Sequence, residues 1–185
     1  MRNTVLPALL VTACAAASAV SPADAADEET LSALDYVEIQ QLVARYARAI
    51  DTCSNNGYDY ADLFTPDGVF VAMFNGEPAA EIQGRERLAE VSGGGSRGCR
   101  NVPWIEQGVR HLYVNHIITP TAEGASGTVD MLMIGLGGDP NRIEHDGYYE
   151  DTYVKTPEGW RFKRRVHHAL LRAGERVQAP AAEGQ

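Results

Sequence analysis

The chain has 185 residues, of which 44% are hydrophobic and 22% are charged. This supplies enough apolar side chains for one compact domain and too little length for two ordinary ones. With 16 basic and 25 acidic residues the net charge is −9, so the surface repels phosphate backbones and general nucleic-acid binding is disfavoured. The 3 cysteines are too few for a disulfide-dense scaffold.

The first 25 residues have the features of a secretory signal peptide. Arg2 gives a positive start, residues 5–20 are rich in Leu, Val and Ala, and residues 23–25 form a small-x-small cleavage pattern. We therefore expect cleavage after residue 25 and a periplasmic or secreted protein. The apolar stretch contains Pro7 and is too short and alanine-rich for a membrane span.

The cysteines leave two alternatives open. Val11-Thr12-Ala13-Cys14 resembles a bacterial lipobox, so Cys14 is either removed with the signal peptide or carries a lipid anchor. In both cases the domain lies outside the cytoplasm. Cys53 and Cys99 remain, and an oxidising compartment favours a disulfide between them. The alternative is two unpaired, partly buried thiols.

Helical patterns dominate the first part of the mature chain. Asp35 and Glu38 have the spacing of a capping box, and an apolar side chain then recurs every three or four residues up to Ile50. This predicts a helix over 35–51. A short helix over 59–64, a turn at 65–68, a strand over 69–74 and a short helix over 84–91 follow.

Strand patterns dominate after a glycine-rich, irregular segment at 92–103. Short turn clusters separate the predicted strands, so neighbouring strands should be antiparallel. Helices first and strands second indicate an α+β domain over 26–172, with a disordered tail over 173–185. The four predicted long strands cover residues 109–118, 125–136, 143–154 and 160–171.

Strict alternation along the first long strand places His111, Tyr113 and Asn115 on one face and His116 on the other. No phosphate-binding loop, nucleophile elbow or cysteine and histidine spacing typical of a metal site occurs. We therefore expect neither a cofactor nor a metal ion.

Six short motifs follow one another between residues 30 and 170. They are Tyr46-Ala-Arg-Ala-Ile-Asp51, Leu63-Phe-Thr-Pro-Asp-Gly68, Ile82-Gln-Gly-Arg-Glu86, Arg110-His-Leu-Tyr-Val-Asn115, Gly147-Tyr-Tyr-Glu-Asp151 and Gly159-Trp-Arg161. Their order and spacing resemble the SnoaL-like branch of the nuclear transport factor two-like superfamily. The resemblance implies a cone in which a bent antiparallel sheet, described as an α+β barrel, wraps around the first helix and encloses a ligand pocket.

Dehydratase and dehydrochlorinase members of this superfamily implicate four positions. Asp51 would orient His111, which would act as general base, because a carboxylate bonded to one ring nitrogen fixes the tautomer of the other. Tyr46 would donate a hydrogen bond to a substrate oxygen, and Arg165 would stabilise a developing anion. Asn115, Tyr149, Tyr113 and Phe70 are expected to bind the substrate or to shape the pocket.

Each of these residues also has a structural interpretation. Asp51 fits a helix-ending turn, His111 a structural or exposed strand histidine, Tyr46 a core position, and Arg165 an exposed basic cluster over 161–165. Asp151 fits a structural ion pair across neighbouring strands.

Three functions remain. The first is a cofactor-independent, dehydratase-like lyase that acts on a small, cyclic or aromatic molecule. The second is an isomerase or cyclase with the same base, and the third is a small-molecule-binding protein without activity. The resemblance further implies a homodimer or homotrimer.

Overall fold

The computed structural model describes residues 30–135 and 143–170. The predicted signal peptide, Cys14 and the predicted tail lie outside these ranges. The elements, in chain order, are α1 (Ala33–Thr52), η1 (Ser54–Gly57), α2 (Tyr58–Ala61), β1 (Phe64–Phe74), β2 (Glu77–Gln83), α3 (Arg85–Val91), η2 (Gly95–Arg97), α4 (Pro103–Glu106), β3 (Arg110–Thr121), β4 (Gly124–Ile134), β5 (Ile143–Thr156) and β6 (Gly159–Leu170).

The long helix α1 begins at a capping box one turn earlier than predicted. The Ser32 side chain accepts a hydrogen bond from the backbone N–H of Asp35, and the Asp35 carboxylate accepts one from the backbone N–H of Ser32. Two otherwise unpaired donors of the first turn are thereby satisfied. The apolar face that the periodicity predicted is buried, and its members are Ile39, Leu42, Val43, Tyr46, Ala49 and Ile50.

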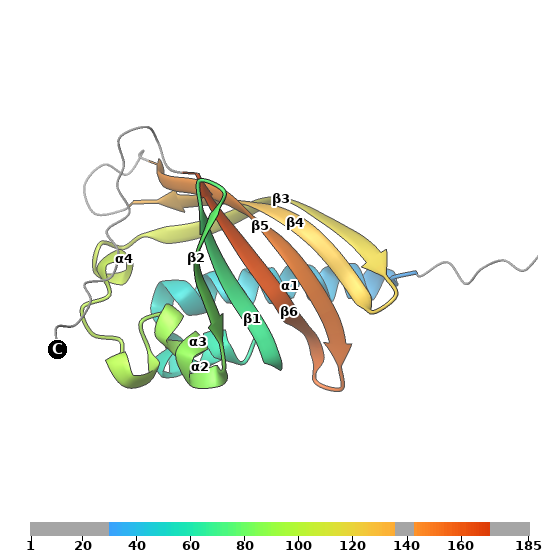
Figure 1. Cartoon of the computed structure of the whole chain (residues 1–185), viewed down its shortest axis with the longest axis horizontal. Helices are drawn as coiled ribbons and strands as arrows, with labels where there is room; N and C mark the ends of the chain where they lie inside the picture. Colours follow the sequence, from blue (N-terminus) through green and yellow to red (C-terminus); the bar gives the residue numbers. More distant parts are fainter. Residues whose placement is uncertain (1–29, 136–142, 171–185) are drawn as a thin grey trace, which may run out of the picture.

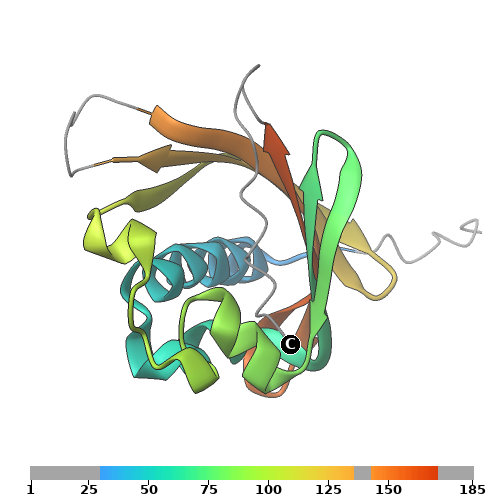
Figure 2. The same ribbon diagram turned by 60° about the vertical axis from the view of Figure 1, so that its left-hand side comes forward.

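The six strands form one curved sheet in the order β2-β1-β6-β5-β4-β3. All neighbouring pairs are antiparallel except β1 and β6, which are parallel. The sheet arches over α1, and the described helices lie on its concave side (Figures 1 and 2). The α+β class is as predicted, but the sheet stays open, with β2 and β3 as its two edges.

Strand β2 was not predicted. The dipeptide Asn75-Gly76, with both φ angles positive, joins it to β1, and this dipeptide is a strong hairpin signal. The turn predicted at residues 65–68, which was expected to end a short helix, is wrong. Its Pro and Gly lie within β1. The pairing of β1 with β6 is interrupted between Phe64 and Val69, so this stretch is accommodated as an irregularity of the strand.

The hydrophobic core fills the space between α1 and the concave face of the sheet. Helix α1 packs mainly against β3 and β6. This arrangement places the last turn of α1 beside the start of β3, where the two residues predicted to act as base and orienter meet. Within the described ranges, no helix is both long and apolar enough to cross a membrane.

Candidate active site

Asp51 in the last turn of α1 and His111 at the start of β3 form a buried hydrogen-bonded pair. Asp51 Oδ1 lies 2.6 Å from His111 Nδ1, and the backbone N–H of His111 donates to the same carboxylate. The side chains are only 6% and 7% exposed. A carboxylate accepts hydrogen bonds, so the short contact to Asp51 favours the His111 tautomer with its proton on Nδ1, in which Nε2 carries the lone pair. This is the arrangement that a general base requires.

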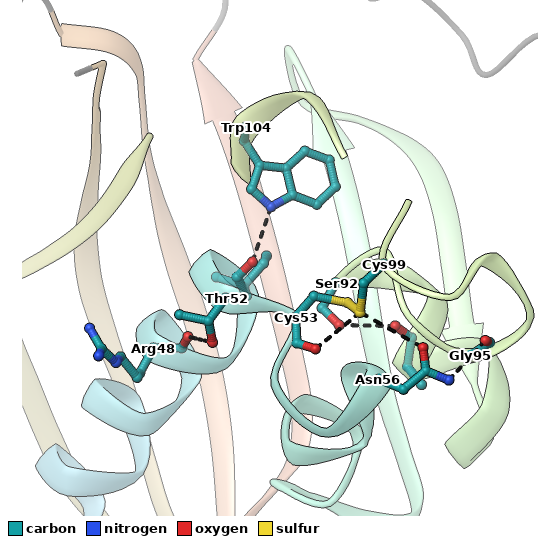
Figure 3. The surroundings of a disulfide bond; sticks show 10 residues. Arg48, Thr52, Cys53, Asn56, Ser92, Gly95, Cys99 and Trp104 are labelled. Atoms are coloured by element: carbon teal, nitrogen blue, oxygen red, sulfur yellow. Dashed lines mark hydrogen bonds between the residues drawn. A yellow bond between two sulfur atoms is a disulfide. The ribbon is translucent and has the colours of Figure 1, made fainter. Parts of the chain in front are cut away.

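Two contacts hold the end of α1 that carries Asp51 (Figure 3). Cys53 ends the helix in a left-handed conformation and forms a disulfide with Cys99, with a Cα–Cα distance of 5.9 Å. The Trp104 indole N–H donates to the backbone oxygen of Ile50 at 3.0 Å. The segment between α3 and β3 is therefore attached to the helix on both sides of Asp51.

His111 borders a groove of about 430 Å³ between α1 and β3, which we call the α1–β3 groove. Its volume is in the range typical of sites for small organic molecules. The wall formed by α1 is largely apolar, whereas β3 contributes imidazole, phenol and amide groups. The groove is lined by Gln40, Val43, Ala44, Ala47, His111, Leu112, Tyr113, Val114, Asn115, His116 and Val129.

A β-bulge in β3 corrects the predicted alternation of this strand. Asn115 has a φ of 54°, and the pairing with β4 shifts between Val114 and Ile117. Such a bulge inserts one extra residue, so the side chains beyond it change face. His116 therefore points to the concave face, as His111 does, and the prediction that they point in opposite directions is wrong. Asn tolerates positive φ better than most residues, but its position within the strand gives no sign of a bulge.

Tyr46 and Arg165 lie together, but neither lines the α1–β3 groove. The Arg165 side chain is fully buried, so the alternative of an exposed basic cluster is wrong for this residue. Its guanidinium carbon lies 4.0 Å from the ring centres of Tyr46 and Tyr149 and 4.5 Å from that of Phe162. The guanidinium is thus surrounded by the negative faces of aromatic rings.

Two polar contacts complete this buried cluster. The Tyr46 and Tyr60 hydroxyls are 3.1 Å apart, and burial raises the pKa of Tyr46 well above its ordinary value, so Tyr46 keeps its proton. An Asp151 carboxylate oxygen lies 3.6 Å from an Arg165 nitrogen, and both side chains are fully buried. Burial raises the pKa of Asp151 to about 6, although the charge of Arg165 opposes this shift.

The four residues predicted to bind substrate are divided between the groove and the core. Tyr113 lines the groove and also lies 5.3 Å from the Arg165 guanidinium. Asn115 is at the exposed rim, and its amide donates to Asp130 at 2.8 Å. Tyr149 is buried beside Arg165, and Phe70 is buried opposite Arg165 in the β1–β6 register.

Within residues 30–135 and 143–170, no group of three or more His, Cys, Asp or Glu side chains is placed to hold a metal ion.

Comparison with known proteins identifies the family. The family model described as SnoaL-like domain matches residues 31–166, which is most of the chain. The chain belongs to the SnoaL-like family. Uncharacterized proteins of Mycobacterium tuberculosis and Mycobacterium bovis are 31% identical to it over 140 residues, which cover 71% of this chain and 83% of theirs.

Solved structures support the fold assignment. A protein of Novosphingobium aromaticivorans, described as nuclear transport factor two-like with a cystatin-like fold, superimposes with a TM-score of 0.61 at 22% identity, over 74% of this chain and 82% of that one. A candidate scytalone dehydratase from the same organism superimposes with a TM-score of 0.56 at 21% identity, over 82% and 96%. At these identities the similarity establishes the fold alone.

Proposed function

We propose that this protein is a cofactor-independent, dehydratase-like lyase, with His111 as general base and Asp51 as the residue that orients it. The observation that carries the proposal is the 2.6 Å contact between Asp51 Oδ1 and His111 Nδ1 at the wall of the α1–β3 groove. The name of the candidate scytalone dehydratase among the structural neighbours agrees with this reaction class.

The elementary step needs only the groups present. His111 Nε2 takes the proton from a carbon next to an electron-withdrawing group, and the electron pair of the broken C–H bond forms a C=C bond. The C–O bond to the leaving group breaks, and the departing hydroxide takes the proton from the His111 imidazolium and leaves as water, which returns the ring to its neutral state. Asp51 stabilises the imidazolium formed in between. A well-placed base of this kind contributes about 10²–10⁴-fold to the rate.

The lining of the groove supports a small, cyclic or aromatic substrate. Val43, Ala44, Ala47 and Val129 supply apolar contact, and Tyr113 adds an aromatic ring. The signal-peptide pattern, together with a disulfide that needs an oxidising compartment, supports a periplasmic or secreted location.

An isomerase or cyclase would use the same base and would return or redirect the proton. A non-catalytic binding function is the second candidate, and one observation favours it. Tyr46 and Arg165, the groups expected to stabilise an oxyanion, are enclosed in the core and do not line the groove. Under this alternative, the Asp51–His111 pair would only shape the binding site.

A screen followed by two variants tests the proposal. Hydroxylated, carbonyl-bearing aromatic and steroid-like compounds are screened by thermal shift, and the products of any hit are analysed by mass spectrometry. We expect loss of water from at least one hit, no turnover in His111→Ala, and a rate about 10²–10⁴-fold lower in Asp51→Asn with unchanged ligand binding. His168→Ala, on the outer face of the sheet, is the matched control. Binding of hits without formation of any product would contradict the lyase. Turnover equal to that of the wild type in both His111→Ala and Asp51→Asn would contradict it as well.

A further inference from the structure

A second imidazole faces the α1–β3 groove and takes no part in the proposed base mechanism. The bulge at Asn115 turns His116 toward the concave face, and His116 lines the groove together with His111 and Tyr113. Its ring lies against the Tyr153 ring, with a centroid distance of 6.1 Å. The groove therefore presents two imidazoles on one strand, each connected to a different buried carboxylate.

A chain of polar contacts fixes the His116 ring. Its Nε2 lies 3.0 Å from the Tyr153 hydroxyl, which donates to Asp151 Oδ2 at 2.7 Å. Asp151 in turn lies 3.6 Å from the Arg165 guanidinium. Because an ionised carboxylate only accepts hydrogen bonds, the proton of Tyr153 points to Asp151. The Tyr153 oxygen therefore accepts, and His116 donates to it through Nε2–H.

The protonation states at neutral pH agree with this direction. With a pKa of about 6, Asp151 is ionised at pH 7. Burial, with a smaller contribution from the charge of Arg165, lowers the pKa of His116 to about 4, so the ring is neutral. A neutral ring with a proton on Nε2 carries a lone pair on Nδ1. No hydrogen bond joins this Nδ1 to another residue within the described ranges.

We propose that His116 is a ligand-contacting residue of the α1–β3 groove, where its Nδ1 accepts a hydrogen bond from a hydroxyl group of the ligand. This inference rests on the proposed function, because it assumes that the groove is the ligand site. The hydroxyl in question is not the leaving group, since a leaving hydroxyl needs a proton and Nδ1 has none to give. The substrate class is thus a small cyclic molecule with a second hydroxyl. Tyr153 and Asp151 are positioning residues for His116.

The tautomer of His116 is the first test, and it needs no ligand. Long-range ¹H–¹⁵N spectra of the full chain with labelled histidine should show His116 protonated at Nε2 at pH 7. Tyr153→Phe keeps the buried ring but removes the hydroxyl, and should yield a mixture of both tautomers. A wild-type protein with the proton on Nδ1 would overturn the proposal, whether or not the variant folds.

Binding of a matched pair of probes is the second test. 2-Naphthol has a hydroxyl donor, and 2-methoxynaphthalene presents a similar ring without the donor. We expect the wild type to bind 2-naphthol about 3- to 10-fold more tightly, which is the range for one neutral hydrogen bond. The preference should vanish in His116→Phe and persist in His168→Phe. His168 is a suitable control because it stacks on Tyr148 and binds Glu150 outside the groove.

The two proposals fail in different experiments. Equal affinities for the two probes in the wild type, or a preference that survives in His116→Phe, would overturn the role of His116. Turnover that survives in His111→Ala would overturn the lyase while leaving the probe preference in place. Calorimetric measurement of the probes and product analysis of the substrate hits therefore separate binding through His116 from catalysis through His111.

Discussion

Removal of the Cys53–Cys99 disulfide should destabilise the protein by an amount that the chain length between the cysteines predicts. The two residues are 46 positions apart. In the chain-entropy description, closing a loop of this length lowers the conformational entropy of the unfolded chain and stabilises the fold by about 4 kcal/mol at 25 °C. Measured values for disulfides are typically about 2–4 kcal/mol, because the reduced unfolded chain retains some structure.

The assay is urea unfolding of the wild type and of the double variant Cys53→Ala/Cys99→Ala. We expect the free energy of unfolding to fall by about 2–4 kcal/mol, which for a domain of this size corresponds to a melting temperature lower by roughly 5–15 °C. Reduced wild-type protein is the control and should match the double variant. A loss below about 0.5 kcal/mol in both samples would refute the reasoning, because the bridge would then constrain nothing in the unfolded chain.

Three further predictions concern Arg165, Asp151 and His116. Replacing Arg165 by Met should lower the free energy of unfolding by about 3–5 kcal/mol, because it leaves Asp151 buried without a counter-charge. The double variant Arg165→Met/Asp151→Leu should recover most of this loss. Urea unfolding in which the effects of the two single substitutions simply add would contradict this prediction. The pKa of Asp151 is raised to about 6, so its contribution to stability is complete below about pH 4 and is lost as the pH rises through 6. The pKa of His116 is lowered to about 4, so its contribution is complete above about pH 6.5 and is lost as the pH falls through 4. Relative to wild type, the urea midpoint of Asp151→Asn should therefore rise as the pH increases from 4 to 7. The urea midpoint of His116→Phe should rise relative to wild type as the pH decreases over the same range. Variant profiles that run parallel to the wild-type profile would contradict both assignments.

Local sequence patterns predicted most of the fold because they report burial along a single element. The three-and-four spacing in α1 and the turn clusters between the long strands each describe a face or an end of one segment. Strand β2 was missed because it is an edge strand whose residues are mostly exposed. An exposed edge lacks the apolar alternation by which strands are predicted.

The candidate site was predictable only in part. Asp51 and His111 were implicated by resemblance to the family, and the structure places them in contact. His116 was assigned to the wrong face because one residue in a left-handed conformation changes the register of everything beyond it. The enclosure of Arg165 depends on three tyrosines and a phenylalanine from α1, β3, β5 and β6, a convergence that no local pattern reveals.

The bulge at Asn115 also affects how the sheet meets other chains. Strand β3 is an outermost strand, and a straight outermost strand offers a continuous row of backbone donors and acceptors on which a second polypeptide can add itself, a common start of aggregation. The extra residue interrupts this row near its middle and twists the strand away from a flat template. The same backbone irregularity that turns an imidazole into the groove thus protects the open side of the sheet against unwanted strand addition.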